Sequence, residues 1–162
     1  MSGAFLILAG AILYTQRSSI TLVSPGTPRA QISYAKVTRV IDGDTIVIDT
    51  GQTVRYIGIN TPEVETSECF ATEAGEINED MILGKEVRLE KDISETDKYG
   101  RLLRYVYTDE GPDGYEMIND ELLKIGLAKV ETVPPDIKYK DEFDQSQDYA
   151  KQNKLGLWSK CF

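Results

Sequence analysis

The 162-residue sequence contains no histidine. This absence excludes a Ser-His-Asp triad, a Cys-His pair, a histidine general base and a histidine-ligated zinc ion. Acid–base chemistry must therefore come from carboxylates, lysine, tyrosine or a metal-bound water. There are only two cysteines, Cys69 and Cys161, which are too few for a zinc site of four thiolates but enough for one disulfide bond.

Basic side chains are also few, with 18 Lys and Arg against 27 Asp and Glu and a formal net charge of −9. Proteins that bind nucleic acid over their whole surface neutralise phosphates with many basic contacts, so this balance argues against that mode. It does not exclude a small local site for a phosphodiester that also recruits a cation. The length suits one domain with a substantial core, and 41% hydrophobic residues is typical of a globular protein.

One uncharged, strongly apolar run occupies residues 3–14. A helix of that length would span about 18 Å, which is short for a membrane crossing and fits the apolar part of a secretory signal better. We therefore expect a signal or membrane-anchor segment at residues 1–16, a linker at 17–31 and a folded domain at 32–162. The protein is then secreted or anchored to the outside of the membrane. The alternative is that the apolar run forms a buried helix of the domain.

Alternation of β-branched and polar residues predicts five strands, and helical periodicity predicts three helices. Two strands flank a turn at Asp42-Gly43-Asp44 within residues 34–50, and the others lie at 52–59, 86–91 and 102–108. The helices lie at 68–83, 117–125 and 139–153. This pattern indicates an α+β fold, and closing so few short strands into a small barrel is the simplest way to remove open sheet edges.

Four places put charged or polar groups at a turn or inside a strand. They are the Asp42–Asp44 turn, Arg55 within a strand, residues 60–63 at the end of that strand, and a turn at residues 97–101. Each alone has an ordinary explanation as a hairpin turn, a surface arginine or a proline turn. Together they provide two guanidinium groups that suit a phosphoryl group, and hard oxygen ligands that suit calcium or magnesium. A free carboxylate beside them could take a proton from water, which answers the needs of phosphodiester hydrolysis without histidine.

The segments VIDGDT, VRYIGINTPE and DKYGR, in this order, resemble those of the thermonuclease family typified by staphylococcal nuclease. The likeness covers residues 34–161. It implies a five-stranded OB-fold barrel with three packed helices. It also implies calcium-dependent hydrolysis of DNA and RNA, preferably single-stranded, to products that end in a 3′-phosphate. We expect the protein to act as a monomer.

By position, this resemblance assigns the chemistry to three side chains. Arg55 matches the arginine that holds the scissile phosphate, and Glu63 matches the glutamate that activates the attacking water. Arg101 matches the arginine that stabilises the pentacoordinate phosphorus and the leaving oxygen. Lys98 and Tyr99 match residues beside the nucleotide phosphate.

The resemblance also implies a calcium site, with Asp44 as a direct ligand, Thr61 as a ligand through its backbone carbonyl, and Asp42 nearby. At Asn60 the family pattern has a ligating aspartate, so this site loses one negative charge. Because charge count is a main determinant of calcium affinity, we expect binding to be weaker by about tenfold or more.

Three further features depend on the same comparison. Thr132 and Pro134 stand where the staphylococcal enzyme has two tyrosines near the base, so affinity for single strands should fall. Eleven residues between positions 63 and 95 are acidic, which would oppose a polyanion wherever they face the groove. Exported relatives carry cysteines at positions like Cys69 and Cys161, which implies a disulfide between them.

Retention of Arg55, Glu63 and Arg101 together favours an exported or membrane-tethered, metal-dependent nuclease. The alternative is a catalytically weakened module of the same fold that binds nucleic acid or protein, which Asn60, the missing tyrosines and the net charge favour. A structural domain of the cell envelope is a third hypothesis, and it depends only on the apolar N-terminal run and the acidity.

Overall fold

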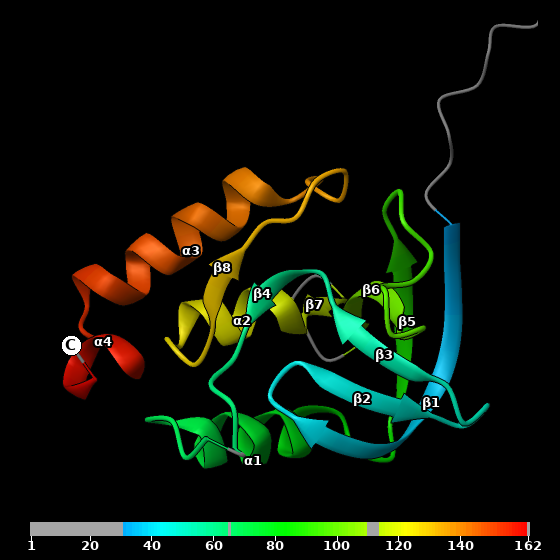
Figure 1. Ribbon diagram of the computed structural model, residues 1–162, viewed down its shortest axis with the longest axis horizontal. Coiled ribbons are helices and arrows are strands. Elements are labelled where there is room, and N and C mark those ends of the chain that lie inside the picture. Colours follow the sequence, from blue (N-terminus) through cyan, green and yellow to red (C-terminus); the bar gives the residue numbers. More distant parts are fainter. Residues whose placement is uncertain (1–30, 65, 110–113, 162) are drawn as a thin grey trace, which may run out of the picture.

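The computed structural model describes residues 31–64, 66–109 and 114–161 (Figure 1). The expected signal or anchor at residues 1–16 and all but the last residue of the expected linker lie outside this part of the chain. The first strand begins at Gln31, one residue before the expected start of the domain. None of the helices in the described ranges is long and apolar enough to cross a membrane.

The described residues form eight strands and four helices, joined by turns and loops. The strands and helices expected from the sequence are present, and their ends lie within three residues of the expected ones, except that the third strand is broken in two. The strands β7 and β8 and the helix α4 were not expected. The elements are β1 (Gln31–Asp42), β2 (Thr45–Ile48), β3 (Thr53–Tyr56), β4 (Gly58–Asn60), α1 (Ala71–Ile82), β5 (Glu86–Lys91), β6 (Leu102–Thr108), β7 (Glu116–Met117), α2 (Ile118–Lys124), β8 (Lys129–Glu131), α3 (Lys140–Gln152) and α4 (Leu157–Lys160).

Five of these strands close into a barrel. Hydrogen bonding runs in the order β3-β2-β1-β5-β6, and β6 returns to β3 in parallel, with Val54 opposite Leu102. The short β7 adds to β6, while β4 and β8 pair separately. Helix α1 packs on β1, and α2 packs on both β6 and α3 (Figure 1). The expected α+β architecture, a small five-stranded barrel with three packed helices, is thereby confirmed.

The expectation of one strand over residues 52–59 is wrong, because the chain breaks between β3 and β4. Gly58, which begins β4, has a φ of +82°, and a Cβ atom there would lie 2.6 Å from Cε2 of Phe143 on α3. Glycine alone tolerates both the left-handed backbone and the close approach. The break turns β4 out of the barrel towards β8, so that Asn60 pairs with Lys129.

A buried asparagine holds this break in place. Asn119, at the start of α2, is fully buried, and its Nδ2 donates to the carbonyl of Ile57 at 2.9 Å. Its Oδ1 accepts from the amide of Val106 on β6, also at 2.9 Å. One side chain therefore satisfies two buried backbone groups and fixes the path of the chain after β3.

Cys69, just before α1, and Cys161, just after α4, form a disulfide bond with their Cα atoms 6.1 Å apart. The two cysteines are 92 residues apart in the sequence. In the chain-entropy account, a closed loop of that length stabilises the fold by about 4 kcal/mol, less any strain. The bond attaches the first helix to the last.

We expect Asn119→Ala to lower the free energy of unfolding by about 2–4 kcal/mol, because the carbonyl of Ile57 and the amide of Val106 both lose a buried partner. Urea denaturation measures this change. Asn153→Ala is the matched control, since Asn153 is exposed at the end of α3, and its effect should stay below about 1 kcal/mol. Equal losses in the two variants would contradict this account of the break.

Candidate active site

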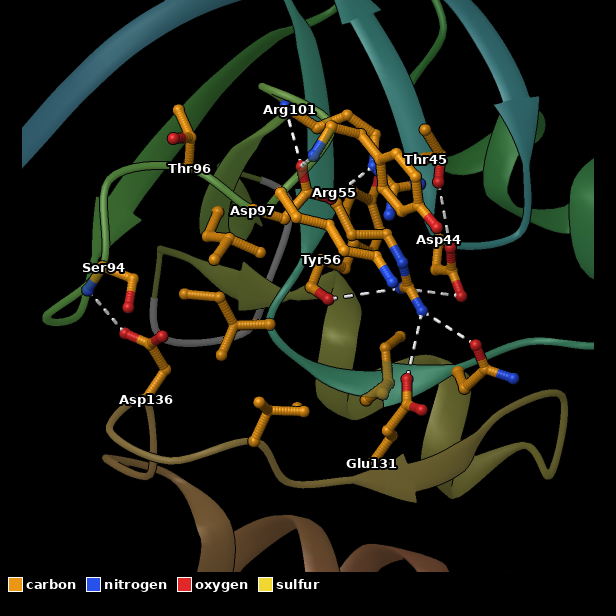
Figure 2. Close-up of a pocket in the computed structure, with 18 of the residues that line it drawn as sticks. Asp44, Thr45, Arg55, Tyr56, Ser94, Thr96, Asp97, Arg101, Glu131 and Asp136 are labelled. Carbon is orange, nitrogen blue, oxygen red and sulfur yellow. Dashed lines mark hydrogen bonds and ion pairs between the residues drawn. The ribbon is translucent and has the colours of Figure 1, made fainter.

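A pocket of about 640 Å³ lies where β3 and β4 meet the loop between β5 and β6 and the segment after β8 (Figure 2). Of the eleven residues selected from the sequence, the two cysteines form the disulfide and Thr61 packs behind the pocket wall. The other eight line the pocket: Asp42, Asp44, Arg55, Asn60, Glu63, Lys98, Tyr99 and Arg101.

A buried ion pair lies at the bottom of this pocket. Oδ2 of Asp44 is 2.8 Å from Nη1 of Arg55, and the two side chains are only 6% and 11% exposed. The same Oδ2 accepts from the amide of Thr61 at 2.8 Å, and Oδ1 accepts from the hydroxyl of Thr45 at 3.0 Å. Burial raises the pKa of Asp44 to about 6, although Arg55 opposes the rise. Its charged form is therefore costly here and favours a cation as partner.

The Asp42-Gly43-Asp44 turn packs closely against its surroundings. A Cβ atom on Gly43 would lie 2.7 Å from the side chain of Thr61, so glycine lets the turn approach the end of β4. Oδ1 of Asp42 accepts from the amide of Asp44 at 3.0 Å, which closes the turn. The turn is therefore packed against Thr61, just after β4, rather than exposed as a free hairpin.

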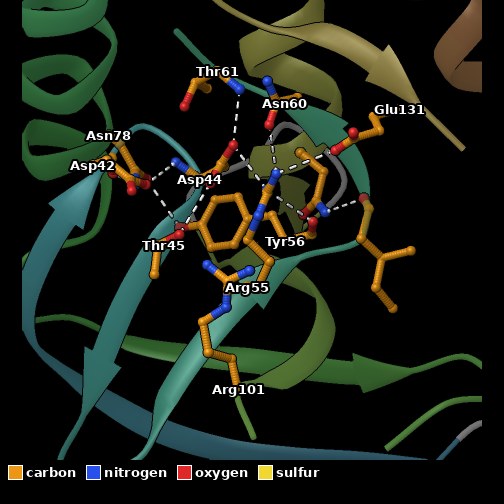
Figure 3. A network of polar contacts seen from close by, with 12 residues as sticks. Asp42, Asp44, Thr45, Arg55, Tyr56, Asn60, Thr61, Asn78, Arg101 and Glu131 are labelled. Carbon is orange, nitrogen blue, oxygen red and sulfur yellow. Dashed lines mark hydrogen bonds and ion pairs between the residues drawn. The ribbon is translucent and has the colours of Figure 1, made fainter. Parts of the chain in front are cut away.

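Helix α1 anchors the same turn through Asn78, which Tyr56 of β3 supports in turn; neither residue was selected from the sequence (Figure 3). Nδ2 of Asn78 donates to the carbonyl of Asp42 at 3.0 Å. The hydroxyl of Tyr56 donates to Oδ1 of Asn78 at 2.9 Å. Tyr56 and Asn78 are 2% and 0% exposed, so a lost hydrogen bond here would not be replaced by water.

Arg55 is engaged by four protein oxygens. Nη1 contacts Asp44, as described, and donates to the carbonyl of Tyr56 at 3.3 Å. Nη2 donates to Oδ1 of Asn60 at 2.8 Å and to Oε2 of Glu131 at 3.5 Å (Figure 3). Glu131, at the end of β8, was not selected from the sequence either, although it directly precedes Thr132, which the resemblance places near the base.

Arg101 is positioned by the turn that precedes β6. Oδ1 of Asp97 accepts from the amides of Tyr99 and Arg101 at 2.9 and 3.0 Å, and Oδ2 is 2.6 Å from Nε of Arg101 (Figure 2). Burial raises the pKa of Asp97, but hydrogen bonds from Arg101 and these amides outweigh it and hold the pKa below its ordinary value. Within the described residues the Nη groups of Arg101 make no hydrogen bond, which leaves a fork of donors for a ligand.

Two exposed side chains complete the set at the mouth of the pocket. The carboxylate of Glu63 makes no hydrogen bond within the described ranges; its amide donates to Glu68 at 3.2 Å. It is therefore available to accept a proton. Tyr99 is 72% exposed, and the charged ends of Lys98 and Arg101 lie 4.9 and 5.4 Å from the centre of its ring.

A buried aspartate shapes the opposite wall. Oδ1 of Asp136, after β8, accepts from the amides of Ile93 and Ser94 at 2.9 and 2.8 Å (Figure 2). These bonds join the loop between β5 and β6 to the segment between β8 and α3. Val133 and Pro134 line this wall, whereas Thr132 does not.

The pocket has more acidic than basic side chains, but few of them come from the acid-rich segment between positions 63 and 95. Its lining includes six carboxylates and three cationic side chains. Of the acidic residues between positions 63 and 95 that the structure describes, Glu63 is the only one in the lining. Glu90, for example, is buried and contacts Lys138, Tyr107 and Tyr139 instead.

Oxygen donors around Asp44 fit a hard cation by their chemistry. Asp42, Asp44 and Asn60 supply carboxylate and amide oxygens, which are the ligands that calcium and magnesium take in proteins. The described residues include no group of three or more acidic, cysteine or histidine side chains able to hold a metal ion. A cation here would therefore need water, backbone or substrate oxygens as additional ligands.

Comparison with known proteins agrees with this arrangement. The family model described as staphylococcal nuclease homologue matches residues 53–160, which include the break, both arginines and Glu63. The chain belongs to the staphylococcal nuclease family. It is 34% identical to a thermonuclease of Staphylococcus hyicus, over 98% of this chain and 96% of that protein.

Other members of the staphylococcal nuclease family are similar over slightly shorter stretches. A thermonuclease of Staphylococcus intermedius is 38% identical over 76% of this chain and 75% of its own length. Endonuclease YncB of Bacillus subtilis is 40% identical over 83% of this chain and 68% of its own length.

We expect Tyr56→Phe to lower the free energy of unfolding by about 1–3 kcal/mol, because Oδ1 of Asn78 would remain buried without its donor. Chemical denaturation followed by tryptophan fluorescence or circular dichroism measures the change. Tyr149→Phe makes the same substitution on the exposed face of α3 and should change stability by less than about 0.5 kcal/mol. A Tyr56→Phe protein as stable as this control would show that the hydrogen bond does not support the turn.

Proposed function

We propose that this protein is a calcium-dependent nuclease that hydrolyses phosphodiester bonds of DNA and RNA and leaves 3′-phosphate ends. The observation that carries the proposal is the convergence of Arg55, Arg101 and Glu63 on one pocket beside the Asp42–Asp44 turn. The names of its relatives, thermonuclease and endonuclease, support it.

In this proposal the two arginines bind the phosphoryl group from two sides. Guanidinium groups donate paired hydrogen bonds to phosphate oxygens, and their charge favours the transition state most, because negative charge on those oxygens is then greatest. Arg101 supplies its free Nη donors and Arg55 the deeper ones. Both guanidinium groups are held in position before substrate arrives, by Asp97 and Asp44 respectively, so neither arginine has to be reoriented.

Glu63 acts as the general base. A water molecule attacks the phosphorus atom and transfers a proton to the Glu63 carboxylate. The bond from phosphorus to the 5′ oxygen breaks, the departing 5′ oxygen takes a proton from solvent water to become a hydroxyl, and the phosphate stays on the 3′ oxygen. The exposed, unbonded state of this carboxylate supports the role, since a base must be free to approach the water.

Calcium, where bound, supplies positive charge that offsets the carboxylates and polarises the phosphodiester. Asp44 and Asn60 are the side chains proposed to hold it, with Asp42 nearby and Thr61 contributing its backbone carbonyl. Asn60 contributes a neutral oxygen, so more of the favourable charge must come from the substrate phosphate.

A binding module of the same fold is the second candidate. It is favoured by the excess of carboxylates in the pocket and by the aliphatic Val133 and Pro134 on the wall where an aromatic platform would stack a base. The two candidates differ in one observable, which is whether a phosphodiester bond is cut.

The first test incubates residues 31–162 and the full chain with heat-denatured DNA and with RNA in millimolar calcium, and with a chelator. We expect degradation that the chelator abolishes. Glu63→Gln and Arg101→Ala should each lower kcat by about 100-fold or more, because the base or a transition-state donor is lost. Thermal melting should be nearly unchanged. Binding of DNA without cleavage in calcium, magnesium or manganese would favour the binding module.

Asn60→Asp tests the cation site. Restoring a carboxylate should lower the calcium concentration that gives half-maximal rate by about tenfold, because an added negative charge strengthens calcium binding. Isothermal titration of calcium into the protein without substrate gives an independent value. An unchanged calcium requirement in both measurements would mean that residue 60 does not contact the ion.

A further inference from the structure

Both Nη groups of Arg55 already contact acceptors within the protein. Nη1 contacts Asp44 and the Tyr56 carbonyl, and Nη2 contacts Asn60 and Glu131. A guanidinium has five N–H donors, and a phosphate binds best to two adjacent ones. A phosphoryl group can therefore reach the fork of Arg55 only if one of these acceptors moves away.

The four acceptors differ in how firmly they are held. The carbonyl of Tyr56 is part of β3, and the carboxylate of Asp44 is 6% exposed and accepts two further hydrogen bonds. Asn60 makes a short 2.8 Å bond from β4. The Glu131 carboxylate is 55% exposed, its contact is the longest at 3.5 Å, and it has no other hydrogen bond within the described residues.

We propose that Glu131 is a built-in competitor of the substrate, whose carboxylate occupies the Nη2 edge of Arg55 until a phosphodiester displaces it. This inference rests on the proposed nuclease function. Carboxylate and phosphate oxygens make the same kind of contact with a guanidinium, so both compete for the same donors. Their like charges also repel at short range.

Displacement occurs when substrate binds, before any bond breaks. Glu131 therefore weakens binding of the ground state and the transition state alike, which raises KM and leaves kcat nearly constant. A residue that merely supported the fold would change stability instead, and a metal ligand would change the calcium requirement. The contact also lies on the solvent side of the guanidinium, so it can open without disturbing the buried pair with Asp44.

The test compares Glu131→Gln with wild type, with Glu86→Gln as the matched control. Glu86 is the exposed first residue of β5, and the loop that lines the pocket follows the other end of this strand. Glu86→Gln therefore removes the same charge at a position outside the pocket. Three quantities are measured: kcat and KM on a single-stranded oligonucleotide in calcium, fluorescence anisotropy of a labelled oligonucleotide in chelator, and calcium affinity by isothermal titration.

We expect Glu131→Gln to lower KM and the oligonucleotide dissociation constant three- to tenfold relative to the control, with kcat and calcium affinity within twofold of wild type. If KM and the dissociation constant of Glu131→Gln equal those of Glu86→Gln, Glu131 does not compete with the substrate. The proposed nuclease function would be unaffected by that result. A tenfold loss of calcium affinity in Glu131→Gln would also overturn the proposal, because it would show that Glu131 is a ligand of the metal ion. If the wild-type protein neither binds nor cuts the oligonucleotide, the proposed nuclease function is contradicted, and the inference about Glu131 is contradicted with it.

Discussion

The buried pair of Asp44 and Arg55 is the constraint around which the site is built. Removing a carboxylate and a guanidinium from water is costly unless every remaining donor and acceptor finds a partner. Here the amide of Thr61, the hydroxyl of Thr45 and the oxygens around Arg55 provide those partners. They come from the β2 turn, the end of β4 and β3, so these segments must meet for the pair to be tolerated.

Local patterns predicted the barrel strands, the three main helices and eight of the residues that line the pocket, because alternation, periodicity and the DGDT, NTPE and DKYGR segments are read over a few residues. Interactions between distant residues were not visible. The break after β3 depends on Gly58 meeting Phe143, and the anchoring of the turn depends on Asn78 meeting Asp42. Glu131 likewise gains meaning only when β8 lies beside Arg55.

Asn60, which departs from the staphylococcal nuclease pattern, and Glu131 meet on a single nitrogen of Arg55. A neutral amide at residue 60 holds that nitrogen less strongly than a carboxylate would, whereas Glu131 adds a charged acceptor. The charged acceptor of this nitrogen therefore lies on a side chain that is far more exposed than Asp44, which contacts the other Nη group. Residues that lie far apart in the sequence thus share one donor in the fold.

The disulfide between Cys69 and Cys161 has a consequence for the order of events during synthesis. It joins the loop before α1 to the residue after α4, so the bond cannot close until every described strand and helix has left the ribosome. The barrel can therefore begin to assemble before this covalent link exists.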